Sequence, residues 1–88
     1  MDKIIKENYE STVLRGLINS KTTDLNFLMK LKEEVLEVEE SYYSSDIENM
    51  WEEIADVILV CLNFANHFNI DIESELKKKI EKNYKRHD

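Results

Sequence analysis

The feature that most constrains this fold is the scarcity of residues that interrupt helices. The chain has no proline and a single glycine, Gly16, among its 88 residues. Proline and glycine are the strongest local breaks in regular structure, and helix formers dominate the rest of the chain. We therefore expect an all-α fold in one domain spanning residues 1–88.

A chain of this length has little core of its own. A domain of this size buries roughly 60–65% of the surface that its unfolded chain exposes. A lone copy is therefore expected to be marginally stable, and we expect it to associate with a second copy.

Apolar spacing and capping residues predict four helices. The first covers about residues 3–18, the second 24–43, the third 47–68, and the fourth runs from a cap at Asp71 to about Arg86. Thr23 or Asp24 is expected to cap the second helix, and the break at residues 44–46 to cap the third. The main apolar stripe of the second helix consists of Leu28, Leu31, Val35, Val38 and Tyr42.

An aspartate interrupts the most apolar segment. The segment WEEIADVILVCLNFA, residues 51–65, is almost entirely apolar after Glu53, yet it contains Asp56. Acidic side chains are rarely buried without a partner, so Asp56 is expected to have one. The alternative is a narrow exposed strip on this helix, which also contains Asn49, Glu53, Asn63 and His67.

Each of two predicted helices presents a pair of acids three residues apart. The pairs are Glu34 with Glu37 and Glu53 with Asp56, and residues at this spacing are neighbours on a helix. Converging carboxylates repel one another when empty, and a hard cation such as Mg²⁺, or Mn²⁺ in its place, relieves the repulsion. Solvated acids are the simpler interpretation, which we adopt for Glu39, Glu40, Glu48 and Glu52.

Two other metal sites are disfavoured. A di-iron bundle uses Glu-x-x-His pairs, but Phe64 precedes His67 and Tyr84 precedes His87 at that spacing. Zinc is disfavoured because the chain has one cysteine, Cys61, and two distant histidines. We expect Cys61 to be a buried thiol, which suits a reducing cytoplasm.

Charge and hydropathy also limit the partners. A net charge of −7 disfavours binding to nucleic-acid polymers and anionic membranes. No apolar stretch reaches the about 20 residues of a membrane span, and no signal peptide is visible at the N-terminus. We therefore expect a cytoplasmic protein. The local exception is KKKIEKNYKR, where six basic residues accompany Glu81.

The acids and this basic segment together match a family pattern. EEVLE at 33–37 and EIAD at 53–56 have the form E-E-x-x-E … E-x-x-D. The basic segment has the form K-x-x-x-N-x-x-(K/R) at Lys79, Asn83 and Arg86. The chain thereby resembles the MazG-like, all-α nucleoside triphosphate pyrophosphohydrolases over nearly its whole length.

The resemblance implies hydrolysis of a (d)NTP or related nucleotide to the monophosphate and pyrophosphate. It implies that Mg²⁺ is bound by Glu34, Glu37, Glu53 and Asp56. Glu33 and Glu34 would act in catalysis, with Glu33 holding a further metal or orienting the attacking water. Substrate would be bound by Lys79, Asn83 and Arg86. Paired chains would complete a four-helix-bundle core in a homodimer or a dimer of dimers. The alternative is a non-catalytic helical interaction module on the same scaffold.

Other residues have two interpretations. Arg15 contacts phosphate or pairs with an acid across the bundle. Four aromatic residues pack in the core or a dimer interface, which we favour, or stack on the base: Phe27, Tyr42, Trp51 and Tyr84. His67 is expected to be structural. The sequence does not specify the base or the sugar.

Overall fold

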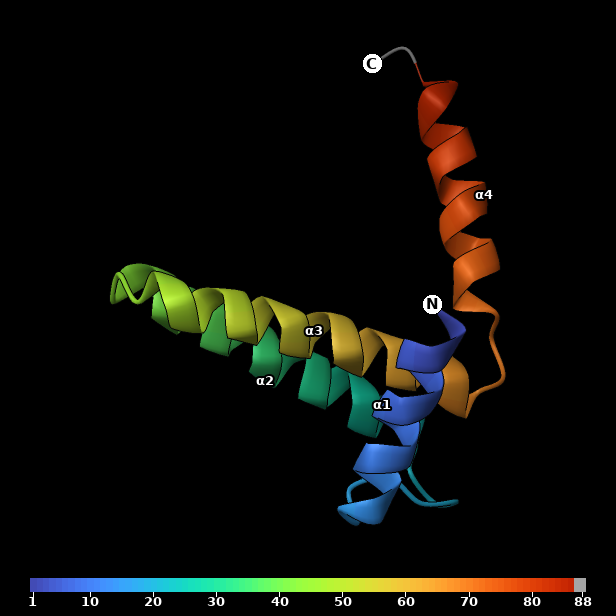
Figure 1. Cartoon of the computed structure of the whole chain (residues 1–88), viewed down its shortest axis with the longest axis horizontal. Coiled ribbons are helices and arrows are strands. Elements are labelled where there is room, and N and C mark those ends of the chain that lie inside the picture. Colours follow the sequence, from blue (N-terminus) through green and yellow to red (C-terminus); the bar gives the residue numbers. More distant parts are fainter. Residues whose placement is uncertain (87–88) are drawn as a thin grey trace.

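The computed structural model describes residues 1–86, and this part of the chain contains four helices and no strand (Figure 1). The helices are α1 (Asp2–Leu14), α2 (Asp24–Tyr43), α3 (Ile47–His67) and α4 (Ile72–Tyr84). The all-α prediction is therefore confirmed. His87 and Asp88 lie outside the described residues. None of the described helices combines the length and apolar character that crossing a membrane requires.

Side-chain caps fix the starts of three helices. Thr23 Oγ1 accepts a hydrogen bond from the backbone N–H of Asn26 at 3.2 Å, and Asn26 Oδ1 accepts one from the N–H of Thr23 at 2.9 Å. This reciprocal pair is a capping box at the start of α2. Asp46 and Asp71 cap α3 and α4 by accepting hydrogen bonds from N–H groups three residues further on. The starts of α2, α3 and α4 are therefore those predicted.

Helix α1 ends earlier than predicted, at Leu14 instead of residue 18. Gly16 adopts a left-handed conformation with φ of 75°, which ends the helix. The N–H of Leu17 donates to the carbonyl of Thr12 at 3.1 Å, as in a Schellman motif. The chain then turns away from α1 toward α2. Helices α3 and α4 also end slightly before the predicted positions.

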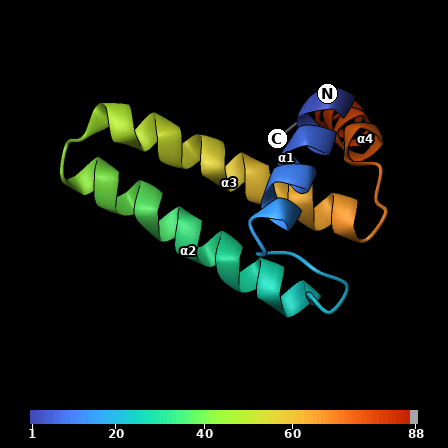
Figure 2. The same cartoon turned by 60° about the horizontal axis from the view of Figure 1, so that its bottom comes forward.

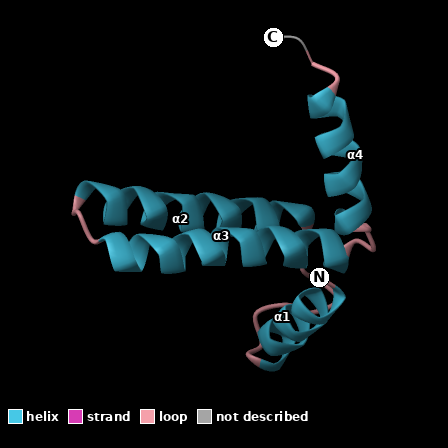
Figure 3. Cartoon of the chain, turned by 45° about the horizontal axis from the view of Figure 1, so that its top comes forward, coloured by secondary structure: helices cyan, strands magenta, loops and turns pink. Residues whose placement is uncertain are grey.

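Helices α2 and α3 form an antiparallel hairpin, which Figure 3 shows side by side. The buried residues of α2 recur every seven positions, at Phe27, Glu34 and Ser41. At the open end, Phe27 stacks on Phe64 with ring centroids 5.1 Å apart. Near the turn, Asn49 Nδ2 donates a hydrogen bond to Ser41 Oγ at 2.6 Å. Glu34 therefore lies in the middle of the contact between the two helices.

The apolar stripe predicted for α2 is divided between two faces. Leu31 and Val38 are half-buried beside the contact with α3. Leu28, Val35 and Tyr42 are instead 42%, 46% and 62% exposed. The hairpin therefore has a second apolar side, which the described part of the chain leaves largely uncovered.

Helix α1 lies against α3 (Figure 2), and side-chain hydrogen bonds join the two helices. Asn8 Nδ2 donates to the carbonyl of Leu59 at 2.8 Å and to Asn63 Oδ1 at 2.9 Å. Asn63 Nδ2 donates to Thr12 Oγ1 at 3.0 Å. These bonds satisfy a buried amide on α3 and fix the position of α1 along it.

His67, at the end of α3, links α1 to the loop before α2. Its Nε2 lies 3.0 Å from the carbonyl oxygen of Thr22, and its Nδ1 lies 2.7 Å from the hydroxyl of Tyr9. A carbonyl only accepts, so Nε2 carries a proton, and in the neutral ring Nδ1 accepts from Tyr9. These contacts support the structural role expected for His67.

The single chain has a small core. Within residues 1–86, the buried hydrophobic residues are Ile18, Phe27 and Leu62. Helix α4 projects away from the hairpin (Figures 1 and 3). The radius of gyration is 14.8 Å, against about 12 Å for a compact domain of this length. Cys61 is exposed, so the expected burial of its thiol is wrong for the single chain.

Candidate metal centre and adjoining pocket

Three carboxylates meet between α2 and α3. Glu34 and Glu37 are neighbours on α2, and Glu53 comes from α3. One carboxylate oxygen of each lies within 4.8 Å of those of the others. Glu34 is buried and the other two are half-buried. The hairpin therefore brings together three of the four predicted metal ligands, which we call the acidic cluster.

Two oxygens of the acidic cluster lack a partner. Glu34 Oε2 and Glu53 Oε2 are buried, and neither has a hydrogen-bond donor while all three carboxylates are ionised. Leaving a buried carboxylate oxygen without a donor or a cation is costly. An all-carboxylate donor set suits hard divalent cations such as Mg²⁺ and Mn²⁺. The unpartnered oxygens therefore fit a cation of this class.

Lys30 neutralises part of the acidic cluster from within α2. Its Nζ lies 3.0 Å from Glu34 Oε1 and 3.7 Å from Glu33 Oε2. The hydrogen bond with Glu34 is the main cause that raises the pKa of Lys30, and desolvation opposes it. Lys30 thus engages one oxygen of Glu34, while the other stays unpartnered.

Hydrogen bonding within the acidic cluster favours a bound proton. Hydrogen bonding with Glu53, and then with Glu34, raises the pKa of Glu37 from 4.5 to about 7. Desolvation and the charges of the same two carboxylates act in the same direction. Without a metal, a proton therefore relieves part of the repulsion that a cation would otherwise relieve.

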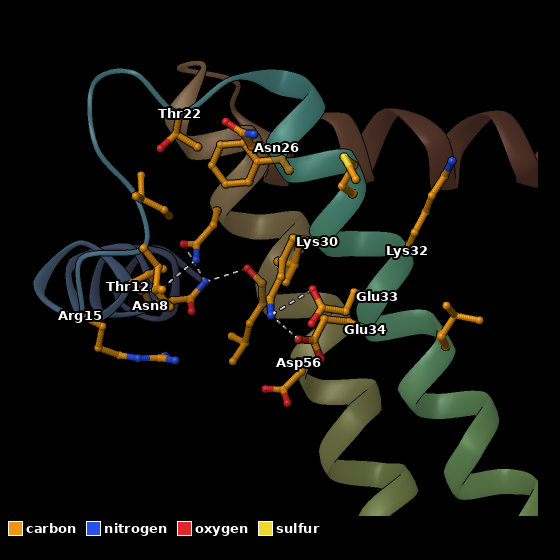
Figure 4. A pocket seen from close by; sticks show the side chains of 18 residues that line it. Asn8, Thr12, Arg15, Thr22, Asn26, Lys30, Lys32, Glu33, Glu34 and Asp56 are labelled. Atoms are coloured by element: carbon orange, nitrogen blue, oxygen red, sulfur yellow. Dashed lines mark hydrogen bonds and ion pairs between the residues drawn. The ribbon is translucent and has the colours of Figure 1, made fainter.

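Asp56 lies outside the acidic cluster. It is exposed, so the expectation that apolar neighbours enclose it is wrong for the single chain. The alternative of an exposed polar strip describes its position. Asp56 instead lines a pocket next to the acidic cluster, together with Glu33 and Glu34 (Figure 4).

This pocket has a volume of about 790 Å³ and lies between α1, the loop before α2, and the hairpin. Its walls include apolar side chains of Ile18, Phe27 and Leu59. Asn8 and Thr12 line it from α1, as Figure 4 shows. The pocket therefore combines an acidic side with amide, hydroxyl and apolar groups.

The predicted substrate-binding residues lie apart from the acidic cluster in the single chain. Lys79 and Asn83 are exposed on α4, and Arg86 follows that helix. Helix α4 contacts α3 but not α2 within the described residues, and it points away from the hairpin (Figure 1). One chain therefore does not bring its own basic segment to its acidic cluster.

The contribution of α1 to the pocket is absent from the sequence-based predictions. Asn8 and Thr12 belong to no recognisable motif. Their partner Asn63 is 55 and 51 residues further along the chain, respectively. No local spacing signals a pair this distant, whereas the acids follow a helical repeat.

Comparison with known proteins gives one match. The model of the MazG-like family matches residues 21–88, which include α2, α3, α4 and the whole acidic cluster. Neither the curated proteins nor the solved structures gave a match. Because the family model covers most of the chain and all of the predicted ligands, this protein belongs to the MazG-like family.

Proposed function

We propose that this protein is an Mg²⁺-dependent nucleotide pyrophosphohydrolase. It would cleave a (d)NTP or a related nucleotide to the monophosphate and pyrophosphate. The observation that carries the proposal is the acidic cluster, with two buried unpartnered oxygens beside a pocket. Membership of the MazG-like family supports the same activity.

In this proposal, Glu34, Glu37 and Glu53 hold the cation, and Asp56 adds a ligand from the edge of the pocket. Bound Mg²⁺ would neutralise phosphate oxygens and lower the pKa of a bound water. Glu33 lines the same side of the pocket and would hold a further cation or orient the attacking water.

The nucleoside part would occupy the adjoining pocket. A volume of about 790 Å³ lies within the roughly 300–1,000 Å³ that is usual for small-molecule sites. The apolar walls suit the faces of a base, and Asn8 and Thr12 add an amide and a hydroxyl group to the lining. Phe27 is 5% exposed and stacks on Phe64, so most of its ring packs in the core.

We also propose that the working unit is a homodimer. Trp51 and Ile58 of α3 are 62% and 53% exposed and lie seven residues apart, like the exposed row of Leu28, Val35 and Tyr42 on α2. A seven-residue repeat is typical of helices packed side by side. Each residue of these two rows comes directly after a more buried residue, so each row is turned by about 100° from a more buried row of its own helix. Because the two helices run antiparallel, these turns bring both rows to the same side of the hairpin. A second hairpin on this side would complete a four-helix core.

A dimer would also explain how the basic segment takes part in substrate binding. Lys79, Asn83 and Arg86 lie apart from the acidic cluster of their own chain. We propose that they bind substrate phosphates at an acidic cluster in the assembled dimer. The positive charges of Lys79 and Arg86 would offset the net charge of −7 that otherwise repels a nucleotide.

An assay of pyrophosphate release with matched variants tests the function. The protein is incubated with a panel of (d)NTPs and Mg²⁺, and monophosphate and pyrophosphate are measured. Glu53→Gln should lower turnover by about 100-fold or more, because it removes a charged cation ligand. Glu52→Gln changes the adjacent, exposed acid and should keep the wild-type rate.

Equal rates for the two variants would show that the acidic cluster is not the site. If no nucleotide is cleaved and Mg²⁺ leaves the melting temperature unchanged, the non-catalytic interaction module is the better interpretation, since a ligand of the folded state stabilises it by mass action.

A further inference from the structure

The pocket joins family-matched helices to a segment that the family model does not cover. The match begins at residue 21, and Asn8, Thr12, Arg15 and Ile18 on the pocket wall all precede it. These residues do not belong to the acidic cluster. They therefore add recognition chemistry that the shared helices do not supply.

Arg15 lies where α1 ends, and its backbone is held from two sides. It is the C-cap residue of α1, followed by the left-handed Gly16. The N–H of Leu17 bonds to the carbonyl of Thr12 at 3.1 Å, which closes the last turn. The hydroxyl of Thr12 in turn accepts a hydrogen bond from Asn63 of α3 at 3.0 Å. The base of the Arg15 side chain is thus fixed relative to the hairpin.

The guanidinium of Arg15 is unengaged in the part of the chain that the structure describes, where it makes no hydrogen bond and no ion pair. The other cations on the pocket wall differ. Lys30 is held by Glu34 at 3.0 Å, and Lys32 extends along the outer side of α2, away from the acids (Figure 4). Figure 4 shows Arg15 extending from the end of α1 toward the side of the pocket that contains Asp56.

An anionic ligand needs a cation at this side of the pocket. Glu33, Glu34 and Asp56 line it, and the chain carries a net charge of −7. Metal ions at the acidic cluster would neutralise only the phosphate groups next to them. A guanidinium keeps its charge at all physiological pH values and donates paired hydrogen bonds to two phosphate oxygens.

We propose that Arg15 binds a phosphate group of the nucleotide, in the same chain that supplies the carboxylates. The inference rests on the proposed function and adds a substrate-binding residue that precedes the family match. Of the two interpretations of Arg15, phosphate binding fits better, because no described acid lies within ion-pair distance of its guanidinium.

Affinity for a non-hydrolysable nucleoside triphosphate analogue, measured by calorimetry with Mg²⁺, tests the assignment. Arg15→Gln should weaken binding by about 10- to 100-fold and raise KM by a similar factor. Arg15→Lys should lose less, because it keeps the charge but not the paired donors. The melting temperature should not change, because the side chain is exposed and unengaged.

Lys21→Gln is the matched control. It removes the same charge from an exposed residue of the loop that does not line the pocket. Because exposed charges at a distance are screened, its effect on affinity should stay below about threefold.

Three outcomes would overturn the assignment. If the wild type hydrolyses nucleotides but Arg15→Gln binds the analogue like Lys21→Gln, Arg15 is not a phosphate ligand and the proposed function stands. A lower kcat with unchanged KM and affinity would likewise exclude a binding role. A wild-type protein that neither binds the analogue nor releases pyrophosphate would overturn the proposed function, and Arg15 with it.

Discussion

Glu37 holds a proton in the metal-free molecule at pH values where an isolated glutamate is ionised. Its contacts with Glu53 and Glu34 raise its pKa from 4.5 to about 7. The folded chain therefore binds more protons than the unfolded chain between these values, and stability falls as pH rises through them. We predict that the metal-free protein loses stability from about pH 4.5 to about pH 7, with no further loss from this group above that range. Melts in the presence of a chelator measure this slope.

Glu37→Gln is the control for this slope, because glutamine has nearly the same shape and does not titrate. The variant should show a flatter dependence on pH. Adding Mg²⁺ should raise the melting temperature of the wild type more at about pH 8 than at about pH 5.5, since a cation binds ionised ligands. An identical slope in the two proteins would mean that Glu37 does not hold the proton.

The residues of the site differ in how well a sequence predicts them. Spacing of three on a helix fixes the relative positions of Glu34 and Glu37 whatever the rest of the fold does. The exposure of Asp56 depends on which side of α3 meets α2, and a helix that is apolar around most of its circumference does not specify that side. The pairing of Asn63 with Asn8 spans 55 residues and has no local signal.

At the scale of the elements, capping chemistry predicts helix starts better than apolar spacing predicts helix ends. Thr23 and Asp71 cap the helices where the sequence places them, because their side chains accept from nearby N–H groups. Leu17 and Ile18 continue the apolar pattern of α1, yet the helix has already ended at Leu14. The single glycine overrides the pattern, because a residue without a Cβ adopts a positive φ at little cost.

The end of α1 should therefore respond to substitution of Gly16. A methyl group at this position meets no atom within 4 Å, so the cost of Gly16→Ala comes from the positive φ of 75° and not from a clash. We predict that Gly16→Ala lowers the free energy of unfolding by about 1–2 kcal/mol, as measured by urea denaturation. Gly16→Asn should retain most of the stability, because asparagine tolerates this conformation. Equal losses for both variants would point to a cause other than backbone strain.

At the scale of the whole molecule, the length of the sequence predicts that one chain is too small to bury a large core. The structure identifies the side of the hairpin on which apolar residues stay exposed. The buried hydrophobic residues among those described are few. The exposed rows on α2 and α3 are apolar and repeat every seven residues. A helix face that stays in water is usually polar, so this pattern is typical of a face packed against another helix. The proposed contact of α4 with a second chain has no signal in the sequence, because such a contact is not within one helix or one hairpin.

The proposed homodimer predicts that a substitution in the interface abolishes assembly but not cation binding. Val35 lies in the middle of the exposed row on α2 and is 46% exposed. Val35→Glu should give the mass of a single chain in sedimentation, because burying a carboxylate in an apolar interface is costly. Ser11→Glu adds the same charge to an exposed position of α1 and should leave the dimer intact.

Cation binding should survive the loss of the dimer. Val35→Glu should still bind Mg²⁺, since all three carboxylates of the acidic cluster come from one hairpin. The same variant should lose hydrolysis if α4 of the second chain completes the site. A wild type that sediments as one chain, with a melting temperature independent of concentration, would exclude the dimer.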